Sequence, residues 1–218
     1  MIWLDALSKS FGKGERCREV FSEVNLLIPS GPIVGIVGER GSGKSTLLRL
    51  IAGVELPDRG HVHIEGMPLW SGGIGMSQHP LMTVRQNLRF LCRLYTEEDM
   101  EMEDHIEKIL ELSELIPYRN MLWKDVPVTH KPRLKFAVMA VLKSDVLLLD
   151  GLPNPKKESE IHEMLQQRMK EVSTLIALPN LKSLRRYCDA GIVIHKNRLH
   201  YFDRIKEAIK YYRKEISE

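Results

Sequence analysis

The stretch GERGSGKS, residues 38–45, matches the phosphate-loop pattern G-x-x-x-x-G-K-[ST] in full. The β-rich apolar run PIVGIVG before it, residues 32–38, predicts a buried strand. The segment STLLRLIAGV after it, residues 45–54, has the apolar spacing of a helix. A strand, a glycine-rich loop and a helix form the context in which backbone N–H groups surround an anion. This stretch therefore predicts a nucleotide-binding α/β fold.

The residue types in the loop suit that chemistry. Glycines let backbone N–H groups turn toward an anion without a Cβ in the way. Lys44 is expected to reach the β- and γ-phosphates, and the Ser45 hydroxyl is expected to be a ligand of Mg²⁺. The loop residues expected to contact the nucleotide are Gly38, Glu39, Arg40, Gly41, Ser42, Gly43, Lys44, Ser45 and Thr46.

Asp150 is the expected second half of this site. It ends the apolar run SDVLLLD, residues 144–150, which is typical of a buried strand. A carboxylate at that point can hold Mg²⁺ opposite Ser45. An isolated aspartate there would indicate only a turn, but the intact phosphate loop favours the magnesium interpretation. The sequence thus predicts a nucleotide and Mg²⁺ as cofactors.

The composition is that of an ordinary globular protein. Of 218 residues, 43% are hydrophobic and 28% are charged. The formal net charge of +3 is too small to indicate a nucleic-acid partner, and it is compatible with a weak attraction to an anionic membrane surface. The N-terminus lacks the apolar core of a signal peptide, and no run approaches 18 apolar residues. We therefore expect any membrane role to depend on a partner.

The three cysteines, Cys17, Cys92 and Cys188, are isolated from one another. Their spacing indicates neither a metal site nor a disulfide framework. They are expected to be small buried hydrophobic residues in a reducing cytosol, and no metal other than Mg²⁺ is expected.

The pattern of apolar residues changes along the chain. Residues 1–11 and 20–29 read as strands, and residues 60–69 alternate like an antiparallel strand. Between residues 83 and 142, three segments have helical periodicity (83–95, 97–116 and the segment from 133), whereas strands and helices alternate after residue 143. We therefore predict an α/β fold with a P-loop NTPase core, whose mixed sheet is flanked by helices, together with an antiparallel β subdomain and an inserted helical lobe. The predicted domain is 1–218, with the core at 1–82 and 143–218 and the lobe at 83–142.

Five segments carry a resemblance to a known family. They are LSKSF (7–11), GSGKSTLLRLIAGVELPDRG (41–60), VRQNLRFLCRLY (84–95), RLKFAVMA (133–140) and LKSLRRYCDAGIVIHKNRLHYFD (181–203). Over nearly its whole length the chain resembles an ABC-transporter ATP-binding subunit, and more narrowly the subunits that power export of capsular polysaccharide. The resemblance implies ATP as the nucleotide, an integral-membrane permease partner and a homo- or heterodimer of nucleotide-binding domains. It also implies a place at the cytoplasmic face of the inner membrane. No added carbohydrate-binding domain is expected after the final residues, YYRKEISE.

The resemblance assigns roles to two further residues. Phe11 matches the aromatic residue that stacks on adenine, although a plain core position is an equal alternative. Gln78, in GMSQHP (75–80), matches the glutamine that senses Mg²⁺ and the attacking water.

The chain departs from the family pattern around the γ-phosphate. Gly151 stands where the family has the glutamate that polarises water, a role worth roughly 10²–10⁴ in rate. Pro179 stands where the family has its switch histidine. In PVTHKP (127–132), Val128 and Thr129 replace the serine and glycine of the signature motif. The segment LPNPKKES (152–159) also lacks the aspartate of the family's D-loop.

These departures affect both composite sites of the implied dimer, because each site combines one subunit's phosphate loop with the other subunit's signature. We therefore expect hydrolysis to be weak or absent. Two alternatives remain open: a non-catalytic, nucleotide-gated regulatory or structural module, and an active ATPase with a substitute base. For the second, Glu158 is the nearest downstream carboxylate. His195 and His200 are expected to have surface or packing roles, and a P-loop small-molecule kinase would leave the long helical insert unexplained.

Overall fold

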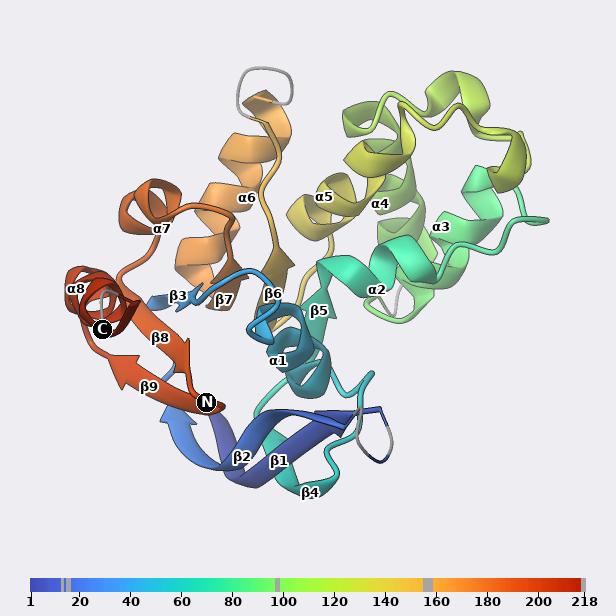
Figure 1. Ribbon diagram of the computed structural model, residues 1–218. Coiled ribbons are helices and arrows are strands. Elements are labelled where there is room, and N and C mark those ends of the chain that lie inside the picture. Colours follow the sequence, from blue (N-terminus) through green and yellow to red (C-terminus); the bar gives the residue numbers. More distant parts are fainter. Residues whose placement is uncertain (13, 15–16, 97–98, 155–158, 217–218) are drawn as a thin grey trace. The chain divides into compact units, whose positions relative to one another are not determined.

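The computed structural model describes residues 1–12, 14, 17–96, 99–154 and 159–216 (Figure 1). The chain divides into two compact units. The first unit contains Met1–Pro68, Asp145–Gly151 and Lys170–Glu218, and the second contains Leu69–Ser144 and Leu152–Met169. The predicted lobe at 83–142 falls within the second unit.

A three-stranded antiparallel sheet lies in the first unit. It consists of β1 (Ile2–Phe11), β2 (Arg18–Ile28) and β4 (Arg59–Ile64), in the order β2-β1-β4. Ile2 of the central strand pairs with Ile28 on one side and Ile64 on the other. Along β1 the alternation of buried side chains shifts at an irregularity between Leu4 and Leu7, so that both of these leucines are fully buried. The predicted antiparallel subdomain is confirmed.

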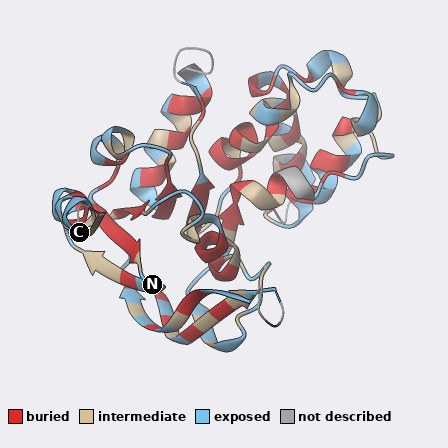
Figure 2. Ribbon diagram, in the orientation of Figure 1, coloured by how far each residue is buried: buried red, intermediate tan, exposed pale blue. Residues whose placement is uncertain are grey.

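The second sheet of this unit is mixed. Within the first unit, the strands of this sheet are β3 (Ile33–Val37), β6 (Val146–Asp150), β7 (Ser173–Ala177), β8 (Ala190–His195) and β9 (Arg198–Phe202). They run in the order β6-β7-β3-β8-β9. The first four are parallel, and β9 pairs antiparallel with β8. β3 is buried at all five residues and β8 at five of six, as strands between helical layers must be (Figure 2). The predicted mixed sheet is confirmed.

Among the described residues of the first unit, the helices are α1 (Lys44–Ile51), α7 (Leu181–Tyr187) and α8 (Ile205–Ile216). Two glycines allow helical segments to approach the sheet closely. A Cβ on Gly35 of β3 would lie 2.8 Å from the Cys188 sulfur, and a Cβ on Gly191 of β8 would lie 2.6 Å from Ala208 of α8. Neither position has room for a larger residue.

The second unit is mainly helical. Its elements are β5 (Pro68–Trp70, which begins at the last residue of the first unit's first segment), α2 (Ser71–Met76), α3 (Val84–Arg93), α4 (Asp99–Leu112), η2 (Ile116–Tyr118), η3 (Trp123–Asp125), α5 (Lys131–Val141) and α6 (Ser159–Glu171, whose last two residues belong to the first unit). A capping box of Thr83 and Gln86 fixes the start of α3. None of the helices in the described part of the chain combines the length and the apolar character needed to cross a membrane.

Helix α2 was not expected from the sequence SGGIGM, because glycine is a poor helix former. The reason lies in the preceding residue. A Cβ on Gly72 would lie 2.3 Å from the Trp70 ring, so the glycine makes room for the indole. Packing of the tryptophan therefore overrides the local propensity.

Candidate nucleotide-binding site

The parallel strands bring three chain segments to one edge of the mixed sheet. In register, Ile36 of β3 pairs with Ala177 of β7, and Ala177 pairs with Asp150 of β6. The chain segments that leave these three strands start at 38, 151 and 178, all at the carboxyl ends of the strands. In open α/β sheets this edge is where ligands bind.

Lys44 lies within the phosphate loop and closes it. Its Nζ donates hydrogen bonds to the carbonyl oxygens of Gly38 at 2.8 Å and Glu39 at 2.6 Å. Burial lowers the pKa of the Lys44 amine, and the nearby carboxylates of Asp150 and Glu39 oppose that shift. The loop is therefore folded around a cation that can turn toward phosphate oxygens.

Ser45 and Asp150 lie side by side. The Ser45 hydroxyl donates a hydrogen bond to Asp150 Oδ2 at 2.7 Å. The two oxygens come from the start of α1 and the end of β6, and hydroxyl and carboxylate oxygens are ligands that suit Mg²⁺. This donor set fits the predicted magnesium site, in which Ser45 and Asp150 would hold the ion while it neutralises phosphate charge.

Gly43 shapes the entry into α1. Its φ of +108° lies in the left-handed region, and a Cβ there would lie 2.5 Å from Val20 Cγ1. No side chain of the described residues caps the first turn of α1. The free N–H groups at this helix start can therefore bind an anion.

A cavity of about 380 Å³ opens beside the loop. Its volume lies within the range of roughly 300–1,000 Å³ that is typical of small-molecule sites. The lining residues are Phe11, Arg18, Val20, Gly41, Gly43, Lys44, Ser45, Thr46 and Arg49. Phe11 is 39% exposed, which contradicts the alternative of a plain core position. The structure thus brings Phe11 and most of the predicted loop residues to one cavity.

The remaining loop residues do not line this cavity. Gly38 offers its carbonyl to Lys44, and Arg40 is exposed. Glu39 and Ser42 line a second cavity of about 380 Å³ with His195.

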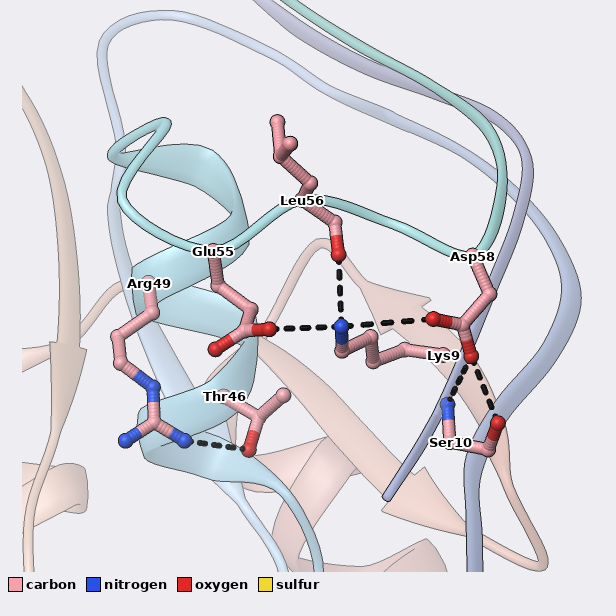
Figure 3. Close-up of polar contacts among 7 residues, drawn as sticks. All are labelled: Lys9, Ser10, Thr46, Arg49, Glu55, Leu56 and Asp58. Atoms are coloured by element: carbon pink, nitrogen blue, oxygen red, sulfur yellow. Dashed lines mark hydrogen bonds and ion pairs between the residues drawn. The ribbon is translucent and has the colours of Figure 1, made fainter. Parts of the chain in front are cut away.

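Two arginines of the cavity were not identified from the sequence. The Arg18 guanidinium donates a hydrogen bond to the Gly41 carbonyl at 3.0 Å, which places a cation at the tip of the loop. The Arg49 guanidinium donates to Thr46 Oγ1 at 3.2 Å (Figure 3). Arg49 follows Ser45 by one helical turn, so the helical pattern contained this signal. Arg18 begins a strand after a polar connection, where no local pattern indicated it.

Gln78 lies in the second unit, whereas Ser45 and Asp150 lie in the first. Its Nε2 donates to the Ile74 carbonyl at 3.1 Å, and its Oε1 is buried with no hydrogen-bond partner among the described residues. The predicted contact of Gln78 with Mg²⁺ remains a prediction.

Two residues that differ from the family pattern, Gly151 and Pro179, lie at the sheet edge in the first unit. Gly151 adopts φ +98° and donates its N–H to the Ala177 carbonyl at 3.0 Å. A Cβ on Gly151 would meet no atom within 4 Å, so space is not what excludes a side chain there. Pro179 is exposed. Neither residue presents a side-chain group that could take a proton or donate a hydrogen bond.

The altered signature lies in the second unit. Val128 is 77% exposed, and Thr129 is exposed too. Pro132 falls in the first turn of α5, where the missing N–H has no partner to lose. Of the D-loop segment 152–159, residues 155–158 lie outside the described residues, and they include Glu158, the nearest downstream carboxylate.

The histidines and cysteines lie as follows. His195 Nε2 lies 3.4 Å from Glu215, and the His200 ring lies tilted against the Tyr211 ring, with 5.2 Å between the ring centroids. Cys92 and Cys188 are buried, and burial raises the pKa of each thiol to about 12. The expectation that all three cysteines are buried is wrong for Cys17, which is exposed because it lies in the polar connection before β2.

The chain is similar to several proteins of known type and to solved structures. The chain is 31% identical over 224 residues to the polysialic acid transport ATP-binding protein KpsT of Escherichia coli, covering 99% of this chain and 100% of KpsT. It is 28% identical over 215 residues to the capsule polysaccharide export ATP-binding protein CtrD of Neisseria meningitidis serogroup B, covering 97% of this chain and 98% of CtrD. Among solved structures, the dimeric post-hydrolysis ATP-binding cassette MJ0796 bound to ADP and Pi superposes with a TM-score of 0.72 at 19% identity, over 93% of this chain and 98% of that one. The last similarity shows the fold.

The fold and the phosphate loop define a P-loop nucleotide-binding domain. The protein-family model described as ABC transporter matches residues 21–152, which is more than half of the chain. The chain therefore belongs to the ABC transporter family, as the resemblance implied, and is an ATP-binding subunit.

Proposed function

We propose that this chain binds MgATP and couples that binding to a membrane permease that exports a capsular or related cell-surface polysaccharide, with hydrolysis weak or absent. It would act at the cytoplasmic face of the inner membrane, as a dimer with itself or with a similar subunit. The substrate class follows the names of KpsT and CtrD, which match this chain over nearly its full length.

The observation that carries the proposal is a difference along one edge of the mixed sheet, where residues suited to binding phosphate lie beside residues that have no reactive side chain. At one edge of the mixed sheet, Lys44 donates hydrogen bonds to two loop carbonyls and Ser45 donates one to Asp150. The strands β6 and β7 end at that same edge, yet Gly151 and Pro179 follow them. A glycine and a proline cannot act as general base or hydrogen-bond donor to phosphate, so binding is supported and cleavage is not.

Purified protein tests the two halves separately. Calorimetric titration with ATP in excess Mg²⁺ is expected to show one site per chain, and phosphate release is expected to stay near the rate of a Lys44→Ala control. Turnover well above that control would refute the loss of hydrolysis. Undetectable ATP binding would refute the nucleotide site.

A nucleotide-gated module without a permease is the second candidate, because the same loss of reactive groups supports it. Co-expression with a six-helix permease separates the two. The exporter subunit is expected to sediment with membranes only when the permease is present. A chain that remains in the supernatant in both cases fits the regulatory module.

A further inference from the structure

Lys9 is an inward-facing lysine on β1, two residues before Phe11. It shares the buried face of the strand with Leu7, and only 8% of Lys9 is exposed. A buried ammonium needs partners, and this one has three. Its Nζ lies 2.6 Å from Glu55 Oε1, 2.8 Å from the Leu56 carbonyl and 3.4 Å from Asp58 Oδ1 (Figure 3). The hydrogen bond with Glu55 raises the pKa of Lys9, so the amine stays protonated.

Asp58 fixes the backbone next to Lys9. Its Oδ2 accepts hydrogen bonds from both the N–H and the hydroxyl of Ser10, each at 2.6 Å. Its own N–H donates to the Ser8 carbonyl at 2.9 Å. The last residues of β1 before Phe11 are therefore tied to the segment that follows α1.

The Lys9 ammonium also lies 5.1 Å from the centroid of the Phe11 ring, within the range of a cation–π interaction. Phe11 lines the cavity beside the phosphate loop, but Lys9 does not. Lys9 is thus too buried to touch a ligand in that cavity. Any effect it has on such a ligand passes through Phe11.

The geometry points to Lys9 as a positioning residue for the nucleotide base: it holds the Phe11 ring from the protein side, so that a purine can stack on the face that lines the cavity. This inference rests on the proposed nucleotide site. A cation against one face of an aromatic ring draws electron density from it, which favours stacking of an electron-rich purine on the other face.

The contacts of Lys9 with Glu55 and Asp58 also connect the Phe11 side of the cavity to the phosphate-loop side. The segment containing Glu55 and Asp58 follows α1, and the start of α1 carries Lys44 and Ser45. Fixing the ring and the phosphate loop to one helix sets the distance between base and phosphates before ligand arrives. Such pre-organisation lowers the ordering cost of binding.

The test compares ATP with inorganic tripolyphosphate, which has the phosphates but no base. Phe11→Ala sets the scale, and is expected to weaken ATP binding on the order of tenfold while leaving tripolyphosphate unchanged. Lys9→Met is expected to weaken ATP about three- to tenfold, again without affecting tripolyphosphate, and to add nothing in the Phe11→Ala background. Lys9→Arg, which keeps a cation at this position, is expected to retain most of the ATP affinity of the unmodified protein. Lys124→Met, at an exposed lysine of the second unit, is the matched control.

Two outcomes would overturn the inference. One is equal weakening of ATP and tripolyphosphate in Lys9→Met, which indicates a general structural role. The other is full additivity with Phe11→Ala, which indicates independence of the ring. If Lys9→Met does not fold, Glu55→Gln replaces it, because it loosens one of the three Lys9 contacts; an unchanged ratio of ATP to tripolyphosphate affinity in that variant also overturns the inference. Failure of the unmodified protein to bind either probe would instead refute the nucleotide site itself.

Discussion

The phosphate loop and the turns after β6 and β7 leave the same edge of one sheet, yet they differ in chemistry. The loop contains Lys44 with two hydrogen bonds to loop carbonyls, and Ser45 bonded to Asp150. The turns contain Gly151 in a left-handed conformation and the exposed Pro179. Binding a phosphate needs backbone N–H groups and a cation, whereas cleaving it needs a placed base. The comparison teaches that a sheet edge can keep residues suited to binding a phosphate (the binding half) without residues suited to cleaving it (the reactive half).

Restoring the reactive half is the strongest challenge to this comparison. The combined variant Gly151→Glu, Pro179→His, Val128→Ser and Thr129→Gly is expected to raise ATP hydrolysis by roughly 10²–10⁴, because it returns the water-polarising base and the groups that bind the γ-phosphate. Phosphate release at saturating MgATP measures the gain.

The matched control carries Gly151→Gln in place of Gly151→Glu, with the other three changes kept. Glutamine has nearly the same shape as glutamate but cannot accept a proton at neutral pH, so this control is expected to stay near the unmodified rate. Equal rates in the two combined variants would contradict the assignment of the missing base to residue 151.

Removal of the Lys44 ammonium tests whether the phosphate loop binds the nucleotide. Lys44→Ala is expected to weaken ATP binding by about 10- to 100-fold, since charge-assisted hydrogen bonds contribute about 1.5–3 kcal/mol each. Isothermal titration calorimetry of the variant gives the ratio, with the exposed Lys124→Ala as its control. An unchanged dissociation constant would remove Lys44 from the site.

Asp150→Asn separates the metal from the nucleotide. The Mg²⁺ concentration needed for half-maximal ATP binding is expected to rise about tenfold, because an amide is a weaker ligand than a carboxylate. ATP binding without Mg²⁺ is expected to be equal or tighter, because one negative charge near Lys44 is gone. Loss of ATP binding both with and without Mg²⁺ would show that Asp150 supports the fold rather than the ion.

The binding half could be predicted from the sequence because its signals are local. Gly38 to Ser45 form one contiguous motif, and Asp150 ends a single apolar run. Backbone turns and a strand ending depend on neighbouring residues, which is why both sheets and the α/β class were predicted as well.

What could not be predicted depends on contacts between distant segments. Lys9 looks like a polar residue in an alternating strand, and only the contacts with Glu55 and Asp58 show that it points inward. Helix α2 depends in the same way on the Trp70 ring over Gly72. Neither contact leaves a periodic trace in the sequence.

The smallest expected effect concerns the backbone of Gly151 and its contribution to the free energy of unfolding. At φ +98° an alanine is disfavoured, although its Cβ would meet no atom within 4 Å. A left-handed conformation costs a non-glycine residue roughly 1–2 kcal/mol, and the stiffer unfolded chain returns part of this. Gly151→Ala is therefore expected to lower the free energy of unfolding by about 1 kcal/mol in urea titrations, and Pro179→Ala at the exposed turn by less than about 0.5 kcal/mol.

Gly151→Glu is expected to lose about as much stability as Gly151→Ala, because the cost lies in the backbone and there is space for the side chain. Equal losses would mean that the backbone of this turn favours glycine, at a cost in stability that the combined variant also carries. No loss in either variant would mean that the turn relaxes freely, and that the missing carboxylate alone separates this sheet edge from a hydrolytic one.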